Sequence, residues 1–184
     1  HAGGAHLVDR LRGDLDRDAA LDLGLARGDL ALPRLQHLAH HDVLDLAPMA
    51  DGGPGFVDVL HSTLGGELLA VTVRGPFGEP VPATLLRVGD RAYVESAQAC
   101  GLHLTRGERA EEATTLGVGD LVTAAVDAGA GEVVVGLGGS GTNDGGAGLL
   151  AALGATADAP LDRGVAGLAG IGAVDLAPAR ARLG

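Results

Sequence analysis

The residues best suited to chemistry lie in one stretch, VVVGLGGSGTNDGGAGLLAALGA, which covers residues 133–155. Its glycines let backbone N–H groups approach an anion, and the helix expected from about Gly145 to Leu153 would direct its positive end to the same place. Ser140, Thr142 and Asn143 add hydroxyl and amide groups to this loop. The pattern is typical of a loop that binds phosphate.

Asp144 is a carboxylate in a place where an anionic ligand is expected. It would be compatible with phosphate as a ligand of nucleotide-bound Mg²⁺, or as the base that accepts a proton from a hydroxyl attacking phosphorus. The alternative is that Asp144 only caps the following helix, a role that aspartate suits well. The residues alone leave both roles open.

A second Asp-Gly-Gly segment begins at Asp51, after the β-like run from Val43 to Ala47. Open α/β sheets collect ligands at the carboxyl ends of their strands, so this loop and the loop at Asp144 could face one cleft. A simple turn-forming role for Asp51 is the alternative.

Two other functions fit the glycine loop less well. The spacing Gly136-x-Gly138-x-x-Gly141 matches a dinucleotide-binding fingerprint, but the residues 142–146 delay the helix that should begin at the third glycine. A hydrolase nucleophile elbow at Ser140 would need glycine at position 142, where the chain has threonine.

The surrounding pattern indicates an α/β fold. We expect a strand over 67–74, a hairpin that pairs 84–88 with 91–95, a helix near 121–126 that ends at Gly129, and a buried strand over 132–137. Short strands alternating with helical periodicity predict a Rossmann-like parallel or mixed sheet with helices on both faces.

The composition excludes several functions. The 184 residues carry a net charge of -11, which makes nucleic acid a poor partner. All 13 basic residues are arginine, so a Schiff-base lysine and a P-loop lysine are ruled out within this sequence. A single cysteine, Cys100, and the lack of a long apolar run favour a cytoplasmic protein with neither membrane anchor nor signal peptide.

The sequence resembles the bacterial glycerate kinase family, whose members phosphorylate D-glycerate with ATP. The similarity rests on GLGGSGTNDGGAGLLAALGA, PMADGGPGFVDVLHSTLGGE, VRGPFGEPVPA, YVESAQACGL and ATTLGVGDLV, in an order and spacing like those of the family. It covers about residues 42–155 and fades toward Gly184.

The resemblance implies a kinase fold of two α/β domains, with Mg-ATP and D-glycerate bound in the cleft between them. It implies Asp144 and Asp51 as catalytic residues, with Asp144 also the Mg²⁺ ligand. The residues that it implies for binding substrate or phosphate are Gly138, Gly139, Ser140, Thr142, Asn143 and Glu95.

The resemblance divides the chain into two parts. Residues 1–41 lack the family's opening motif, which resembles Ala-Pro-Asp-Ser-Phe-Lys-Gly, and we interpret them as a misread or disordered segment. Residues 42–184 form a partial glycerate kinase region, so activity could be lost by truncation. The alternative is a non-catalytic α/β fragment that binds an anion or nucleotide, or self-associates through unpaired sheet edges. A dinucleotide-binding oxidoreductase is the least favoured function.

Overall fold

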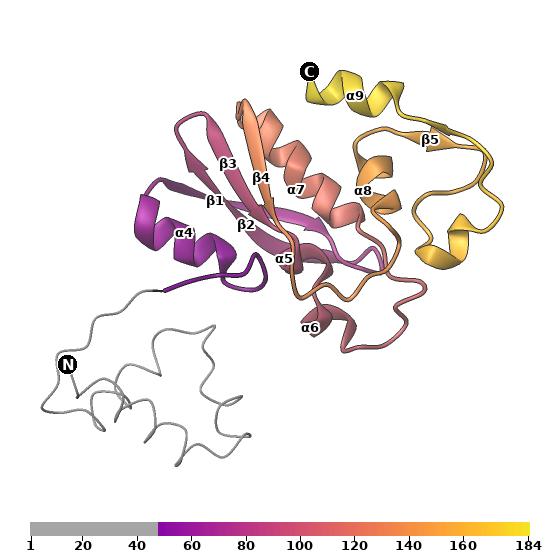
Figure 1. Cartoon of the computed structure of the whole chain (residues 1–184), viewed down its shortest axis with the longest axis horizontal. Coiled ribbons are helices and arrows are strands. Elements are labelled where there is room, and N and C mark those ends of the chain that lie inside the picture. Colours follow the sequence, from indigo (N-terminus) through magenta and orange to yellow (C-terminus); the bar gives the residue numbers. More distant parts are fainter. Residues whose placement is uncertain (1–47) are drawn as a thin grey trace, which may run out of the picture. The chain divides into compact units, whose positions relative to one another are not determined.

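A computed structural model describes residues 48–184 (Figure 1). The predicted segment 1–41 and the expected strand at 43–47 lie outside the described residues. The helices are α4 (Phe56–Leu64), α5 (Ala97–Cys100), α6 (Leu102–Thr105), α7 (Leu116–Asp127), α8 (Ala147–Ala152) and α9 (Ala177–Leu183), with the 3₁₀ helix η1 (Val165–Leu168). The strands are β1 (Glu67–Arg74), β2 (Pro80–Val88), β3 (Arg91–Glu95), β4 (Glu132–Gly136), β5 (Thr156–Ala157) and β6 (Val174–Asp175).

The main sheet is mixed, with the strand order β1-β2-β3-β4. Strand β2 pairs antiparallel with both β1 and β3, and β4 runs parallel to β3. The predicted strand at 67–74 and the predicted hairpin are confirmed, since Val88 pairs with Arg91 across a turn in which Gly89 has a positive φ of 62°. Parallel β4 is reached from β3 through α7, as a crossover connection requires.

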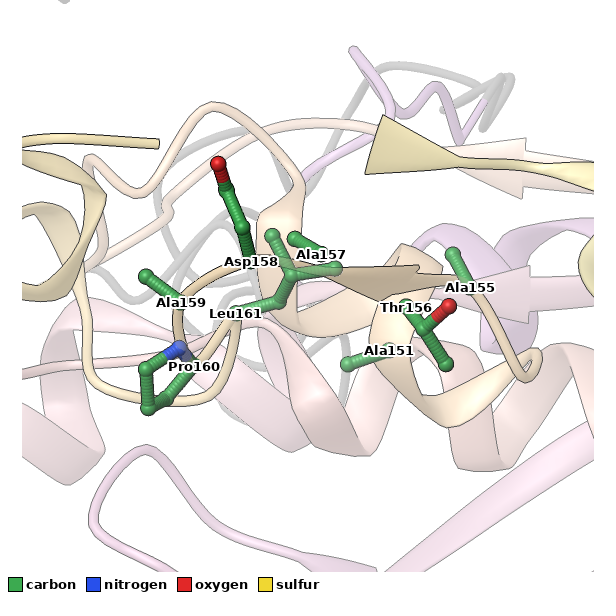
Figure 2. Close-up of a pocket in the computed structure, with 8 residues that line it drawn as sticks. All are labelled: Ala151, Ala155, Thr156, Ala157, Asp158, Ala159, Pro160 and Leu161. Atoms are coloured by element: carbon green, nitrogen blue, oxygen red, sulfur yellow. The ribbon is translucent and has the colours of Figure 1, made fainter. Parts of the chain in front are cut away.

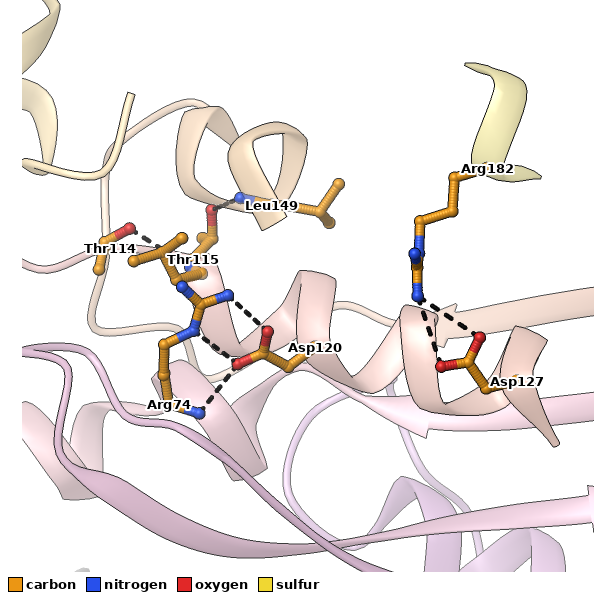
Figure 3. A network of polar contacts seen from close by, with 8 residues as sticks. Arg74, Thr114, Thr115, Asp120, Asp127, Leu149 and Arg182 are labelled. Atoms are coloured by element: carbon orange, nitrogen blue, oxygen red, sulfur yellow. Dashed lines mark hydrogen bonds and ion pairs between the residues drawn. The ribbon is translucent and has the colours of Figure 1, made fainter. Parts of the chain in front are cut away.

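One face of the sheet packs on α7. Side chains that alternate along β2 and β3, such as Leu85 and Val94, are buried against Val118, Leu121 and Ala125 of the helix. The same helix is tied to the edge strand β1 by Asp120, whose carboxylate accepts hydrogen bonds from the Arg74 backbone amide and guanidinium (Figure 3). The sheet and α7 thus form one core.

The opposite face carries α4, which packs on β2 and β3 (Figure 1). Because Ala92 and Val94 face α7, the intervening Tyr93 and the following Glu95 point to the α4 side. The prediction of an α/β sheet with helices on both faces is confirmed.

A smaller layer follows the glycine loop. Helix α8 packs on α7, and the short β5–β6 ribbon and α9 complete an apolar cluster that includes Leu153, Leu161 and Ala179. An exposed ion pair between Arg182 and Asp127 links α9 to the end of α7 (Figure 3). No helix among residues 48–184 is long and apolar enough to cross a bilayer.

Candidate functional site

The candidate site lies where the parallel strands β3 and β4 end. Glu95, the last residue of β3, pairs with Gly136, the last residue of β4, so the segments that follow both strands begin at the same edge. The Asp51 loop reaches this edge as well, because a methyl group placed on Gly53 would lie 3.5 Å from the carbonyl carbon of Gly138. The two glycine-rich segments are therefore in direct backbone contact at the end of β4.

The three fingerprint glycines allow this close packing. A methyl group at position 136 would lie 2.6 Å from the Phe56 ring, and one at position 138 would lie 2.7 Å from the Cα of Gly53. At position 141 it would collide with the Thr105 side chain. Helix α8 begins only at Ala147, well after the third glycine. The pattern is thus explained by packing within the protein, without a dinucleotide.

The tip of the glycine loop presents polar groups to solvent. Ser140 and Asn143 are exposed, and the Ser140 hydroxyl lies 2.8 Å from that of Thr142. The Ser140 oxygen also accepts a hydrogen bond of 3.1 Å from the Thr142 amide, which fixes the turn. The loop is anchored at its base, where the Leu102 amide donates to the Gly139 carbonyl. These groups are held in place and can reach a ligand.

Asp144 has a different environment, since its side chain is only 1% exposed. Its carboxylate accepts hydrogen bonds from the backbone amides of Thr115, Gly146 and Gly148 at 2.8, 3.0 and 3.1 Å. The Thr115 hydroxyl donates a further bond at 2.9 Å, and the Thr114 hydroxyl donates a weaker one at 3.4 Å. The geometry therefore supports the capping role that the sequence had left open.

This arrangement changes the expected anion site. The predicted positive end of the helix is present at the start of α8, but the anion that lies there is Asp144 itself. Thr115, one of the donors to Asp144, also contacts α8, because its hydroxyl accepts a hydrogen bond from the Leu149 amide at 3.0 Å (Figure 3). Sequence reasoning missed Thr114 and Thr115, and the quoted ATTLGVGDLV segment was the only signal that could have drawn attention to them.

Glu95 lies below the surface and is 5% exposed. Its Oε2 accepts hydrogen bonds from the amides of Gly55 at 3.0 Å and Val57 at 3.4 Å, at the start of α4. Burial raises the pKa of Glu95, an effect opposed by hydrogen bonds from the α4 backbone and reinforced by the nearby charge of Asp58. Glu95 was expected to bind substrate. In the structure, its carboxylate contacts the backbone amides at the start of α4.

Asp51 is the exposed carboxylate of the site. Its Oδ1 accepts a hydrogen bond of 2.9 Å from the Gly53 amide, which closes a short turn and leaves the rest of the carboxylate in contact with solvent. No cluster of three or more His, Cys, Asp or Glu side chains suited to a metal ion occurs within residues 48–184. A metal ion at this edge would need a bound molecule to supply some of its ligands.

Cys100 lies below the loop and is 1% exposed, with its Sγ 3.7 Å from the Ser140 hydroxyl. Burial raises the pKa of the Cys100 thiol, so it remains protonated at neutral pH. Its structure agrees with the role of a small buried apolar side chain.

A separate depression of about 400 Å³ lies beside β5, lined by Ala151 and residues 155–161 (Figure 2). Half of its lining residues are alanine, and its one carboxylate, Asp158, accepts hydrogen bonds from the amides of Gly172 and Ala173. The depression offers few groups that could orient a polar substrate.

Known proteins match this chain over most of its length. A sequence model described as the glycerate kinase family matches residues 31–184. A glycerate kinase of Bacillus subtilis is 47% identical over 111 residues, and a glycerate 2-kinase of Escherichia coli is 42% identical over 112 residues. These matches cover 58% and 59% of this chain.

A solved structure supports the same grouping. A crystal structure named for a glycerate kinase 2 of Salmonella typhimurium LT2 superposes with a TM-score of 0.65 at 33% identity and covers 77% of this chain. The matched region spans 29% of the length of each of the two curated relatives and 41% of the solved chain. The family match covers well over half of the sequence, and the chain therefore belongs to the glycerate kinase family.

Proposed function

We propose that this chain takes part in the ATP-dependent phosphorylation of D-glycerate, with 2-phosphoglycerate as the product. The observation that carries the proposal is the contact between the Asp51 loop and the glycine loop at the carboxyl end of β4. Family membership supports the reaction, and the relative named glycerate 2-kinase supports the position of transfer.

The loop groups are suited to anions. We assign the hydroxyls of Ser140 and Thr142 and the amide of Asn143 to the orientation of phosphate or glycerate, together with the backbone of Gly138 and Gly139. Phosphoryl transfer depends mainly on positioning and electrostatic stabilisation, so fixed donors of this kind are what the reaction needs.

The two aspartates receive different roles in this proposal. Asp51 is the candidate base or metal ligand, because its carboxylate is exposed beside the loop. Asp144 is assigned to holding the loop and α8, since its oxygens accept bonds from buried amides and hydroxyls, and Mg²⁺ would have to displace these donors.

Mg-ATP fits the donor set around Asp51. Mg²⁺ in proteins is commonly held by one or two carboxylates together with substrate phosphates, so a single exposed aspartate is sufficient on the protein side. Bound Mg²⁺ would offset the repulsion between anionic substrates and a chain of net charge -11. Asp51 would hold the ion, and Ser140 and Thr142 would orient the phosphates.

The test is phosphorylation of D-glycerate by this chain with Mg-ATP, with the product identified by ³¹P NMR. Asp51→Asn is the active-site variant, and Asp58→Asn, on the exposed side of α4, is the matched control. Turnover that Asp51→Asn abolishes and Asp58→Asn retains would support the proposal. Well-folded chain that binds neither substrate would refute it.

A second candidate is a self-associating fragment without turnover. One observation favours it: β1 lies at the edge of the sheet, contains no proline or lysine, and exposes Leu68. Light scattering over a range of protein concentrations tests this, and a monomer at every concentration would exclude it.

A further inference from the structure

The start of α4 depends on an acceptor from another element. Gly55 at its N-cap has φ 92° and provides no side chain, so the helix has no cap of its own. Four amides at a helix start need acceptors outside the helix. The Glu95 carboxylate supplies one for the amides of Gly55 and Val57.

The same residues fix the Asp51 loop. Between Gly55 and Val57 lies Phe56, whose amide donates to the Gly53 carbonyl at 3.1 Å and whose ring covers Gly136. Gly136 is the β4 partner of Glu95, and the following amide, Ser96, donates to the Gly136 carbonyl at 3.0 Å. The first turn of α4 is therefore held between the Glu95 side chain and the end of β4.

We propose that Glu95 is a positioning residue, whose carboxylate holds the first turn of α4 and thereby keeps the Asp51 loop packed on Gly138 of the glycine loop. Its two acceptor contacts join β3 to a segment 40 positions away in the sequence. Phe56 and Gly53 connect this turn to the glycine loop. The Phe56 amide is hydrogen-bonded to the Gly53 carbonyl, and the two residues pack on Gly136 and Gly138. Glu95 acts through Asp51 and does not touch the substrate.

The experiment measures amide hydrogen exchange across residues 52–64 in the full chain. Its variants are Glu95→Ala, Glu95→Gln and the control Glu67→Gln, which alters an exposed residue of β1. Loss of the acceptor should raise exchange at Gly55 and Val57 by about tenfold or more, with β2 unchanged. Glu95→Gln should fall between the wild type and Glu95→Ala, since its amide oxygen still accepts a hydrogen bond.

Activity supplies the second readout, and only this part of the inference rests on the proposed function. We expect a raised KM for Mg-ATP or glycerate in Glu95→Ala and partial recovery in Glu95→Gln. Faster exchange in a chain whose wild type has no turnover would support the positioning role while refuting the kinase activity. Unchanged exchange in both variants would overturn the positioning role, and lost turnover alongside it would assign Glu95 to the substrate.

Discussion

Replacing Asp144 distinguishes a structural role of its carboxylate from a catalytic role. Asp144→Ala removes the acceptor of three backbone amides, those of Thr115, Gly146 and Gly148. Each buried donor left unpaired costs about 1–3 kcal/mol, and partial access of water reduces the sum, so we expect a loss of about 3–5 kcal/mol in the free energy of unfolding. For a chain of this size, this lowers the melting temperature by roughly 6–20 °C.

The assay is thermal and urea unfolding of Asp144→Ala, Asp144→Asn and the control Asp51→Asn. Asparagine keeps the shape but turns an NH₂ group toward the donors, so Asp144→Asn should lose about 2 kcal/mol, and Asp51→Asn should unfold like the wild type. If Asp144→Asn is as stable as the wild type and yet loses all turnover, the carboxylate acts on a ligand and the capping argument fails.

Three further predictions concern the same edge of the sheet. Asp51→Asn should lower turnover by roughly 10²–10⁴-fold without changing the melting temperature, as measured by steady-state kinetics; full activity would remove Asp51 from the chemistry. Gly138→Ala should destabilise by about 1–3 kcal/mol, because the methyl group would lie 2.7 Å from the Gly53 Cα, whereas Leu137→Ala, at a side chain 73% exposed, should have little effect in the same urea titration. Because burial raises the pKa of Glu95, the native state keeps this proton at pH values where the unfolded chain has lost it; stability should therefore fall as the pH rises from the ordinary glutamate value through the raised one. Glu95→Gln should lack this contribution, and identical pH profiles of unfolding would contradict the assignment.

The strands and long helices could be predicted from local pattern. Alternation in ELLAVTVR, the turn at Gly89 and the apolar run before the glycine loop each correspond to an element of the structure. These signals are local because one buried face repeats with the period of the element. The mixed arrangement of the sheet followed from the hairpin together with the helix that precedes β4.

The roles of individual polar residues could be predicted less well. The partners of Glu95 are amides 38 and 40 positions away in the sequence, and its expected role in binding substrate stays a prediction. The Thr115 contacts with Asp144 likewise join residues 29 positions apart. Local periodicity cannot predict these hydrogen-bonded pairs, because they depend on which loops the fold brings together.

The two Asp-Gly-Gly segments show why a local motif does not determine chemistry. At the second segment, Asp144 turns inward because Thr115 and the start of α8 offer it buried donors. At the first segment, the amides at the start of α4 donate to the Glu95 carboxylate, and the partner of Asp51 within residues 48–184 is the amide of Gly53, which leaves Asp51 exposed. A carboxylate that the helix does not need is the one available to a metal or a hydroxyl proton. In our proposal the Glu95 carboxylate leaves Asp51 available for chemistry, so that the same three residue types would serve structure in one loop and a candidate reaction in the other.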